Sequence, residues 1–262
     1  MPDVDLDQVR IHYQFDGPAN GPVLVLSNSL GTGLPMWDRV LPAFTQQYRV
    51  LRYDTRGQGA SSVPPGPYTL EVLAQDVLSL LSTLGIEHCF FCGLSLGGMT
   101  GIWLGIHAQD RVRKLVLANT AAHIGTVSGW NDRIRQVEQE GVEALADNII
   151  ERWFTPAFHQ SSPGEVQATR AMLAASPTQG YAACCAAIRD MDLTSDLHLI
   201  RSPSLVIGAE FDPVISSAES RIVQQGITEA TYLELPTAHL SAIERPEEFS
   251  RAVLSFLQSQ EL

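Results

Sequence analysis

The chain has 262 residues, 45% of them hydrophobic, enough to bury the core of one large domain or of a domain with an insertion. Its 17 Lys and Arg against 29 Asp and Glu give a net charge of −12 without any basic block, which excludes nucleic acid and anionic membranes as expected partners. The acidic start lacks the parts of a secretory signal, and no apolar run is long enough to cross a bilayer. We therefore expect a soluble, cytoplasmic protein.

Strands and helices are predicted to alternate along the first 120 residues. Apolar runs bounded by Gly or Pro, such as 22–27, are typical of strands buried on both faces. Residues 70–84 carry apolar side chains three and four positions apart, which predicts a helix with one apolar face. This alternation predicts β-α-β units and a mainly parallel sheet. Strands are predicted at 4–6, 10–15, 22–27, 49–54, 89–92 and 114–119, and helices at 37–48, 70–84 and 99–107.

The strand at 89–92 ends in Gly93-Leu94-Ser95-Leu96-Gly97, and a helical segment follows at once. Gly-x-Ser-x-Gly between a strand and a helix is typical of a nucleophile elbow, a sharp turn that holds a Ser hydroxyl at its tip. A Cβ at Gly93 or Gly97 would meet the adjoining strand or helix, so glycine is expected there. A chance Gly/Ser turn would give the same five letters, but the strand and the helix around them favour Ser95 as a nucleophile.

From residue 121 to 196 the alternation stops, and helices are predicted throughout, including 130–140 and 142–153. Ser162-Pro163-x-Glu165 is interpreted as a capping box with Pro at the first helical position, and Ser176-Pro177 repeats part of that signal. We interpret 121–196 as a helical cap inserted into a core made of 1–120 and 197–262. The core resumes with strands at 204–208 and 231–235 and helices near 218–225 and 246–257.

A Ser hydroxyl needs a base to react near neutral pH, and the base needs a carboxylate that orients it. Among seven histidines, His239 follows the last predicted strand, at the edge where open α/β sheets bind ligands. His123, at the entrance to the cap, is a weaker candidate. Asp212 follows the strand at 204–208 and is the predicted carboxylate, with Glu210 as the alternative. The order Ser, Asp, His is that of the α/β-hydrolases.

Acyl transfer also needs preorganised donors that stabilise an oxyanion. The backbone N–H of Leu96, directly after the nucleophile, is one predicted donor. The second is the N–H of Leu30, in the small-residue loop after the strand at 22–27. Asp54 also ends a strand, but it precedes the nucleophile, and we interpret it as loop scaffolding.

The four cysteines are predicted to be reduced and buried. Cys89 and Cys92 form a C-x-x-C inside a predicted strand, whereas a redox pair normally opens a helix. Cys184 and Cys185 lie in an Ala-rich helical run with no His at metal-ligand spacing. The sequence therefore indicates neither a metal nor a cofactor.

With Ser95, Asp212 and His239 placed, the whole chain resembles the α/β-hydrolases, which implies a mostly parallel central sheet flanked by helices with an inserted helical cap. Longer phrases resemble the 3-oxoadipate enol-lactonases of aromatic catabolism. This narrower resemblance implies a serine hydrolase of the β-ketoadipate pathway that opens the lactone ring of a small anionic substrate. The phrases are Leu26–Thr32, Gly93–Gly98, Trp130-Asn131-x-Arg133, Arg152-Trp153-Phe154, Gly180–Asp190 and Ala238-His239-Leu240.

The free carboxylate of such a substrate needs a local cation in a protein of charge −12. Arg133 is the candidate, because it lies three residues beyond Trp130 on a predicted helix and the two side chains are neighbours. Trp130 and Trp153 are candidates for the walls of the site. The alternative interpretation is a solvated arginine and two core tryptophans. Alternatives for the function are a carboxylesterase, a carbon–carbon bond hydrolase or a non-catalytic ligand receptor, since this fold serves several roles.

Overall fold

Eight strands form a single sheet within residues 2–259, the part of the chain that the computed structural model describes. Their spatial order is β1-β2-β4-β3-β5-β6-β7-β8. The pairs β1/β2 and β2/β4 are antiparallel, and every other pair is parallel, so the mainly parallel sheet is confirmed. The strands are β1 Asp3–Leu6, β2 Val9–Asp16, β3 Val23–Ser27, β4 Arg49–Tyr53, β5 Cys89–Leu94, β6 Val112–Ala118, β7 Ser204–Ala209 and β8 Thr231–Leu235.

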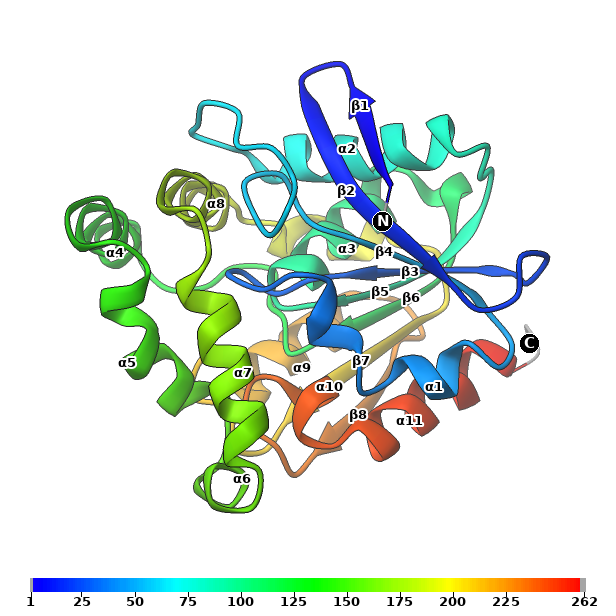
Figure 1. The fold of residues 1–262 in the computed structure, drawn as a ribbon. Helices are drawn as coiled ribbons and strands as arrows, with labels where there is room; N and C mark the ends of the chain where they lie inside the picture. Colours follow the sequence, from blue (N-terminus) through cyan, green and yellow to red (C-terminus); the bar gives the residue numbers. More distant parts are fainter. Residues whose placement is uncertain (1, 260–262) are drawn as a thin grey trace.

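Helices cover both faces of this sheet (Figure 1). α2, α3 and α9 pack on one face against residues such as Val25 and Leu117, and α1 and α11 pack on the other against residues such as Leu24 and Val116. Successive strand residues thus face opposite apolar layers, which explains the continuous apolar runs. The helices are α1 Leu41–Phe44, α2 Leu70–Thr83, α3 Leu96–His107, α9 Ser217–Gly226, α10 Ser241–Glu244 and α11 Pro246–Gln258, with 3-10 turns η1 Leu34–Trp37, η2 Gln109–Arg111 and η3 Thr194–Leu199.

The helices between β6 and β7 lie together beside one end of the sheet (Figure 1). We call this segment, residues 127–190, the helical insertion. Within it, α4 packs against α8 and α5 packs against α7. The division of the chain into a core of 1–120 and 197–262 and a cap of 121–196 stays a prediction. The insertion consists of α4 Val127–Glu140, α5 Glu143–Trp153, α6 Pro156–Ser161, α7 Pro163–Ala174 and α8 Thr178–Asp190.

Two local predictions were wrong. The helix expected at 37–48 is the turn η1 followed by the four-residue α1, because Pro42 lies in the first turn of α1 and has no N–H with which to continue a helix from residue 37. The capping box expected at Ser162 is absent, since its side chain accepts no N–H and its ψ of 50° departs from the extended cap conformation. A capping box does form at Ser216 and Glu219, at the start of α9.

β5 passes into α3 through Ser95, whose φ of 57° and ψ of −117° are rare for a residue with a side chain. Hydrogen bonds hold this conformation. The Ser95 N–H donates to the carbonyl of Ala118 at 3.0 Å, and the Thr120 hydroxyl donates to the carbonyl of Ser95 at 2.8 Å. Such strain persists only where its surroundings enforce it, and it is frequent at functional sites.

The two glycines of the elbow are required by contacts between backbone atoms. A Cβ on Gly97 would lie 2.0 Å from the carbonyl oxygen of Ser27 in β3, and a Cβ on Gly93 would lie 2.1 Å from the carbonyl oxygen of Gly97. These are the strand and the helix that the sequence predicted as neighbours. Glycine lets α3 start directly against β3.

We expect Gly97→Ala to lower the free energy of unfolding by about 3 kcal/mol or more, the upper end for overpacking, because backbone atoms cannot rotate away from the added methyl group. Urea denaturation measures the change. Gly164→Ala is the matched control, since a Cβ there has no atom within 4 Å, and it should be neutral or stabilising. An unfolding midpoint for Gly97→Ala equal to that of the wild type would contradict the contact.

Candidate active site

Ser95, His239 and Asp212 form a hydrogen-bonded triad at the carboxyl ends of β5, β8 and β7. His239 Nε2 lies 3.0 Å from Ser95 Oγ, and His239 Nδ1 lies 2.8 Å from Asp212 Oδ2. All three residues are buried. The fold thus brings together the three residues selected from the sequence, although Ser95 and His239 are 144 positions apart. The distance from Oγ to Nε2 is suited to proton transfer.

Backbone groups as well as His239 hold the Asp212 carboxylate. Its Oδ1 accepts the N–H of Val214 at 2.8 Å and the N–H of Ile215 at 3.0 Å. Burial raises the pKa of the Asp212 carboxyl, but His239 and these two N–H groups outweigh burial, so the pKa lies below its ordinary value. The ionised carboxylate requires the proton of His239 on Nδ1, which leaves Nε2 to accept the proton of Ser95.

Asn119, which the sequence does not single out, holds the acid from the end of β6. Its Nδ2 donates to Asp212 Oδ2 at 3.1 Å and to the carbonyl of Ala238 at 3.2 Å, and its Oδ1 accepts the hydroxyl of Ser241 at 2.6 Å. The residue is fully buried, with a φ of 45° that Asn tolerates better than most residues. A polar residue directly after a buried strand is the signal that would have found it.

The loop after β8 is bonded to the helical insertion. The N–H of Ala238 donates to Glu244 Oε2 at 3.1 Å, and Glu244 also accepts the N–H and the hydroxyl of Thr155, between α5 and α6. The N–H of Leu240 donates to the carbonyl of Trp153 at 3.2 Å. These bonds fix the end of α5 to the loop that carries the histidine.

Two backbone N–H groups beside Ser95 donate to no acceptor within the described residues. They belong to Leu96, the first residue of α3, and to Leu30, in the loop after β3. The loop is held by Gln58, whose Oε1 accepts the N–H of Gly31 at 3.0 Å. Free N–H groups beside a nucleophile are suited to stabilise an oxyanion. They are the two donors predicted from the sequence, and their role stays a prediction.

The hydroxyl of Ser95 and the ring of His239 line a cavity of about 30 Å³ between the sheet and the helical insertion. That volume holds roughly one or two water molecules. The predicted substrate-binding residues Trp130, Arg133 and Trp153 all line it, and the Trp153 ring centroid lies 6.3 Å from that of His239. The other lining residues are Ser29, Leu30, Met99, Ile124, Arg152, Ile188, Val214 and Ile215.

The alternative candidates lie outside this cavity. His123 Nδ1 lies 3.2 Å from the carbonyl oxygen of Met191, and Glu210 is exposed. Asp54 accepts the N–H groups of Leu34 and Ala60, at 2.9 and 2.8 Å, as loop scaffolding would. All four cysteines are free and buried, as predicted. Within the described range, no group of three or more His, Cys, Asp or Glu side chains is placed to hold a metal ion.

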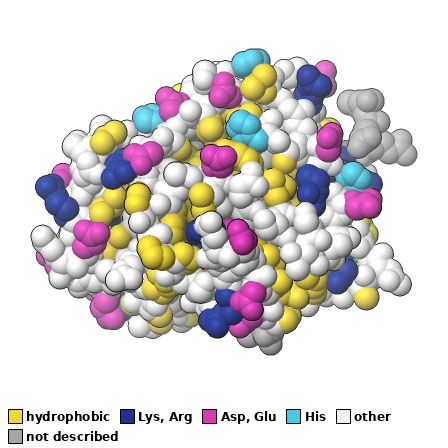
Figure 2. Space-filling model, turned by 90° about the horizontal axis from the view of Figure 1, so that it is seen from above, with side chains coloured by type: hydrophobic (Ala, Val, Ile, Leu, Met, Phe, Trp, Pro, Cys, Tyr) yellow, Lys and Arg dark blue, Asp and Glu magenta, His cyan; other side chains and the backbone are white. Residues whose placement is uncertain are grey.

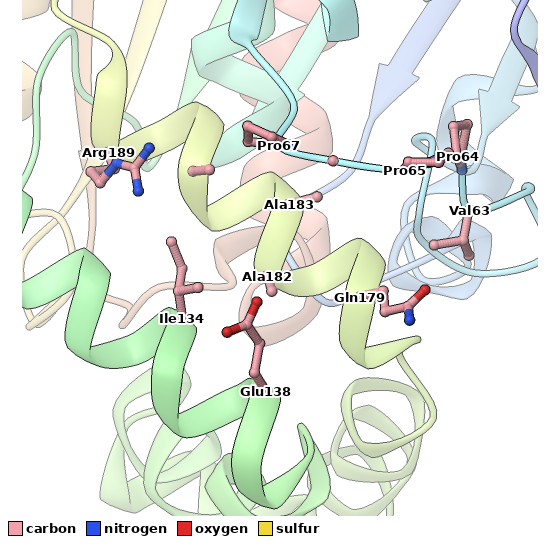
Figure 3. A pocket seen from close by; sticks show the side chains of 12 residues that line it. Val63, Pro64, Pro65, Pro67, Ile134, Glu138, Gln179, Ala182, Ala183 and Arg189 are labelled. Atoms are coloured by element: carbon pink, nitrogen blue, oxygen red, sulfur yellow. The ribbon is translucent and has the colours of Figure 1, made fainter.

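A larger groove of about 630 Å³ lies between the Pro-rich segment 63–67 and helices α4 and α8 (Figure 3). Its charged residues are Glu138 and Arg189, and Arg189 is paired with Asp190. The groove shares no residue with the cavity at Ser95 and is lined by no Ser, Cys or His. Size therefore does not identify the reactive site, whereas the hydrogen-bonded triad does.

Comparison with known proteins agrees with the fold. The family model described as alpha/beta hydrolase fold matches residues 22–246, which include the triad. The chain therefore belongs to the α/β-hydrolase family. Within residues 2–259, no helix has both the length and the apolar character needed to span a bilayer.

Similarity over almost the whole chain narrows this class. The proteins 3-oxoadipate enol-lactonase 2 and 3-oxoadipate enol-lactonase 1 of Acinetobacter baylyi are each 41% identical to it, over 94% and 95% of this chain and 92% and 93% of their own. The crystal structure of the enol-lactonase from Burkholderia xenovorans LB400 superposes with a TM-score of 0.97 at 42% identity, covering 98% of this chain and 100% of that one. Within the family, the chain groups with the 3-oxoadipate enol-lactonases, as the sequence phrases predicted.

We expect Asn119→Gly to slow the reaction of Ser95 with a fluorophosphonate probe about tenfold or more, because a hydrogen bond to a charged group is worth about 1.5–3 kcal/mol. Glycine keeps the backbone conformation at φ 45° while removing the amide. Ser241→Ala removes only the bond to Asn119 Oδ1 and should have a smaller effect. Labelling of Asn119→Gly at the wild-type rate, with the fold intact by circular dichroism, would show that Asp212 needs no support from β6.

Proposed function

We propose that this protein is a serine hydrolase that opens the lactone ring of 3-oxoadipate enol-lactone to give 3-oxoadipate. The observation that carries the proposal is the 41% identity to two enol-lactonases over nearly the whole chain. The hydrogen-bonded Ser95, His239 and Asp212 supply the chemistry that ring opening needs.

In the first half of the reaction, Ser95 Oγ attacks the lactone carbonyl carbon while its proton passes to His239 Nε2. The N–H groups of Leu30 and Leu96 hold the resulting oxyanion. Collapse of the tetrahedral intermediate breaks the ring C–O bond and leaves an acyl group on the serine. The ionised Asp212 stabilises the imidazolium that forms in between.

The leaving group is an enolate that stays attached to the acyl chain. His239 returns its proton to this enolate, and the enol tautomerises to the ketone. An enol is a better leaving group than a simple alcohol, so less acid assistance is needed at this step. His239 then takes a proton from water, which attacks the acyl-enzyme and releases 3-oxoadipate, and the serine recovers its proton.

Arg133 is the proposed partner of the substrate's carboxylate. It lines the cavity, one of its Nη atoms donates to the hydroxyl of Tyr181, and its Nε is buried with no hydrogen-bond partner in the described chain. Its guanidinium carbon lies 5.5 Å from the ring centroid of Trp130. The two tryptophans, Trp130 and Trp153, are the proposed apolar walls around the lactone ring.

A cytoplasmic location and a place in the β-ketoadipate pathway are part of this proposal. Four free, buried cysteines fit a reducing compartment. The pathway follows from the proposed substrate.

Wild-type protein is expected to turn over freshly generated 3-oxoadipate enol-lactone with a higher kcat/KM than a simple p-nitrophenyl ester. Ser95→Ala should lower kcat at least about a thousandfold, because the attacking oxygen is gone while the fold stays the same. The absorbance of the lactone measures turnover, and circular dichroism checks that the fold is intact. Preference for the simple ester would favour a carboxylesterase, and lactone turnover retained by Ser95→Ala would exclude this serine as the nucleophile.

Arg133→Met should raise KM for the anionic lactone about tenfold or more, since it removes a charge-assisted hydrogen bond while keeping an apolar stem. Steady-state kinetics on the lactone and on a neutral p-nitrophenyl ester give the comparison. Arg170→Met is the control, because Arg170 also belongs to the helical insertion, pairs with Asp147 and does not line the cavity. Equal rises in KM for both substrates would remove Arg133 from the carboxylate role.

A further inference from the structure

A second arginine lines the cavity at Ser95. Arg152, in the last turn of α5, lies beside Arg133 of α4 in the cavity wall. Within residues 2–259 neither guanidinium forms an ion pair, and that of Arg152 forms no hydrogen bond. The two side chains thus retain most of their hydrogen-bond donors.

This lack of acidic partners is unusual for the helical insertion. There, Arg135 pairs with Asp132, Arg170 with Asp147 and Arg189 with Asp190. The arginines of the insertion that do not line the cavity are thus paired with neighbouring carboxylates, and the two that line it are not. Arg133 is half-buried and Arg152 is exposed, and without an internal carboxylate both guanidinium groups remain available to an anionic ligand.

The same two arginines also line a groove of about 500 Å³ between α4 and α5. Because both residues belong to both spaces, their side chains form the wall between the groove and the cavity of about 30 Å³ at Ser95. The cavity alone is too small for a lactone ring with an acid side arm. Within the described residues, Arg152 makes no hydrogen bond that its movement would break, so the wall opens at little cost on its Arg152 side, whereas Arg133 is bonded to Tyr181.

The charges around this wall favour an anion there. Burial and the positive charge of Arg133 lower the pKa of Arg152, which stays protonated at neutral pH because a guanidinium has a very high intrinsic pKa. A carboxylate between two like charges relieves their repulsion. On the face in Figure 2, acidic and basic side chains are scattered without a basic patch. Attraction of an anion therefore depends on local groups.

We propose that Arg152 and Arg133 together bind the carboxylate of the substrate at the wall between the cavity and the α4–α5 groove, and that the anion reaches Ser95 through this wall. The inference rests on the proposed function in that it takes Ser95 to attack a substrate that carries a carboxylate. Two acidic residues, Asp132 and Glu151, also line the groove, and Asp132 forms an ion pair with Arg135. Arg152 thus acts as a specificity-determining residue.

The test compares two activated esters of equal chain length. Mono-4-nitrophenyl adipate ends in a carboxylate, and 4-nitrophenyl hexanoate ends in a methyl group. Wild type should prefer the adipate ester, and Arg152→Met should lower the ratio of the two kcat/KM values about tenfold or more, the effect of losing one charge-assisted hydrogen bond. Arg152→Lys keeps the charge without the planar fork and should give an intermediate ratio.

Arg170→Met is the matched control and should keep the wild-type ratio, because Arg170 and its partners Glu143 and Asp147 line neither the cavity nor the groove. Glu151→Gln removes a negative charge from the groove and should raise the ratio. An unchanged ratio in Arg152→Met, or equal losses on both esters, would overturn the proposal. The two esters test this proposal separately from the proposed function. If the ratio falls in Arg152→Met but the wild type does not turn over the enol-lactone, the arginine pair is supported and the lactone is rejected as the substrate. If the wild type turns over the lactone but the ratio is unchanged in Arg152→Met, the lactone is supported and the arginine pair is rejected.

Discussion

The approach of Gly97 to the carbonyl of Ser27 is the constraint on which the rest of the site depends. It lets α3 begin directly against β3, and it fixes Ser95 at the tip of the turn. The same contact places the N–H of Leu96 near the loop that carries Leu30, because that loop continues from the end of β3. One close backbone contact therefore sets the proposed nucleophile and both proposed oxyanion donors relative to one another.

The histidine side of the site is assembled differently, through polar side chains rather than through backbone contact. Asn119 reaches Asp212 and the loop of His239 from β6, and Glu244 joins that loop to the helical insertion. The bonds of Asn119 are buried and those from Thr155 to Glu244 are partly buried, and an unmade hydrogen bond is expensive in a buried site. The insertion is thereby attached to the loop at the end of α5, next to Arg152. A movement of α5 that opened the arginine wall would pull on this loop.

Much of the sheet was predictable because its strands are apolar runs bounded by Gly or Pro, as at 22–27. The triad was predictable because each of its members follows such a strand. The failures have local causes. The helix expected from residue 37 was misjudged because one proline outweighs helical spacing, and the cap at Ser162 failed because a cap needs a backbone conformation as well as a residue type. The role of Asn119 was not predicted because the residues that it bonds, Asp212 and Ala238, are 93 and 119 positions away in the sequence.

The sequence analysis selected Arg133 but not Arg152, although both occur in phrases that resemble the enol-lactonases. The wall that the two arginines share arises only when α4 and α5 pack together. In the proposed binding mode, a carboxylate accepts hydrogen bonds from both guanidinium groups, including the buried Nε of Arg133 that has no partner in the described chain. A neutral substrate offers these groups no charged acceptor. In a protein of net charge −12, such selectivity requires that the pair be free of internal acids. The absence of ion pairs at both arginines within residues 2–259 is therefore the feature that fits them to an anion.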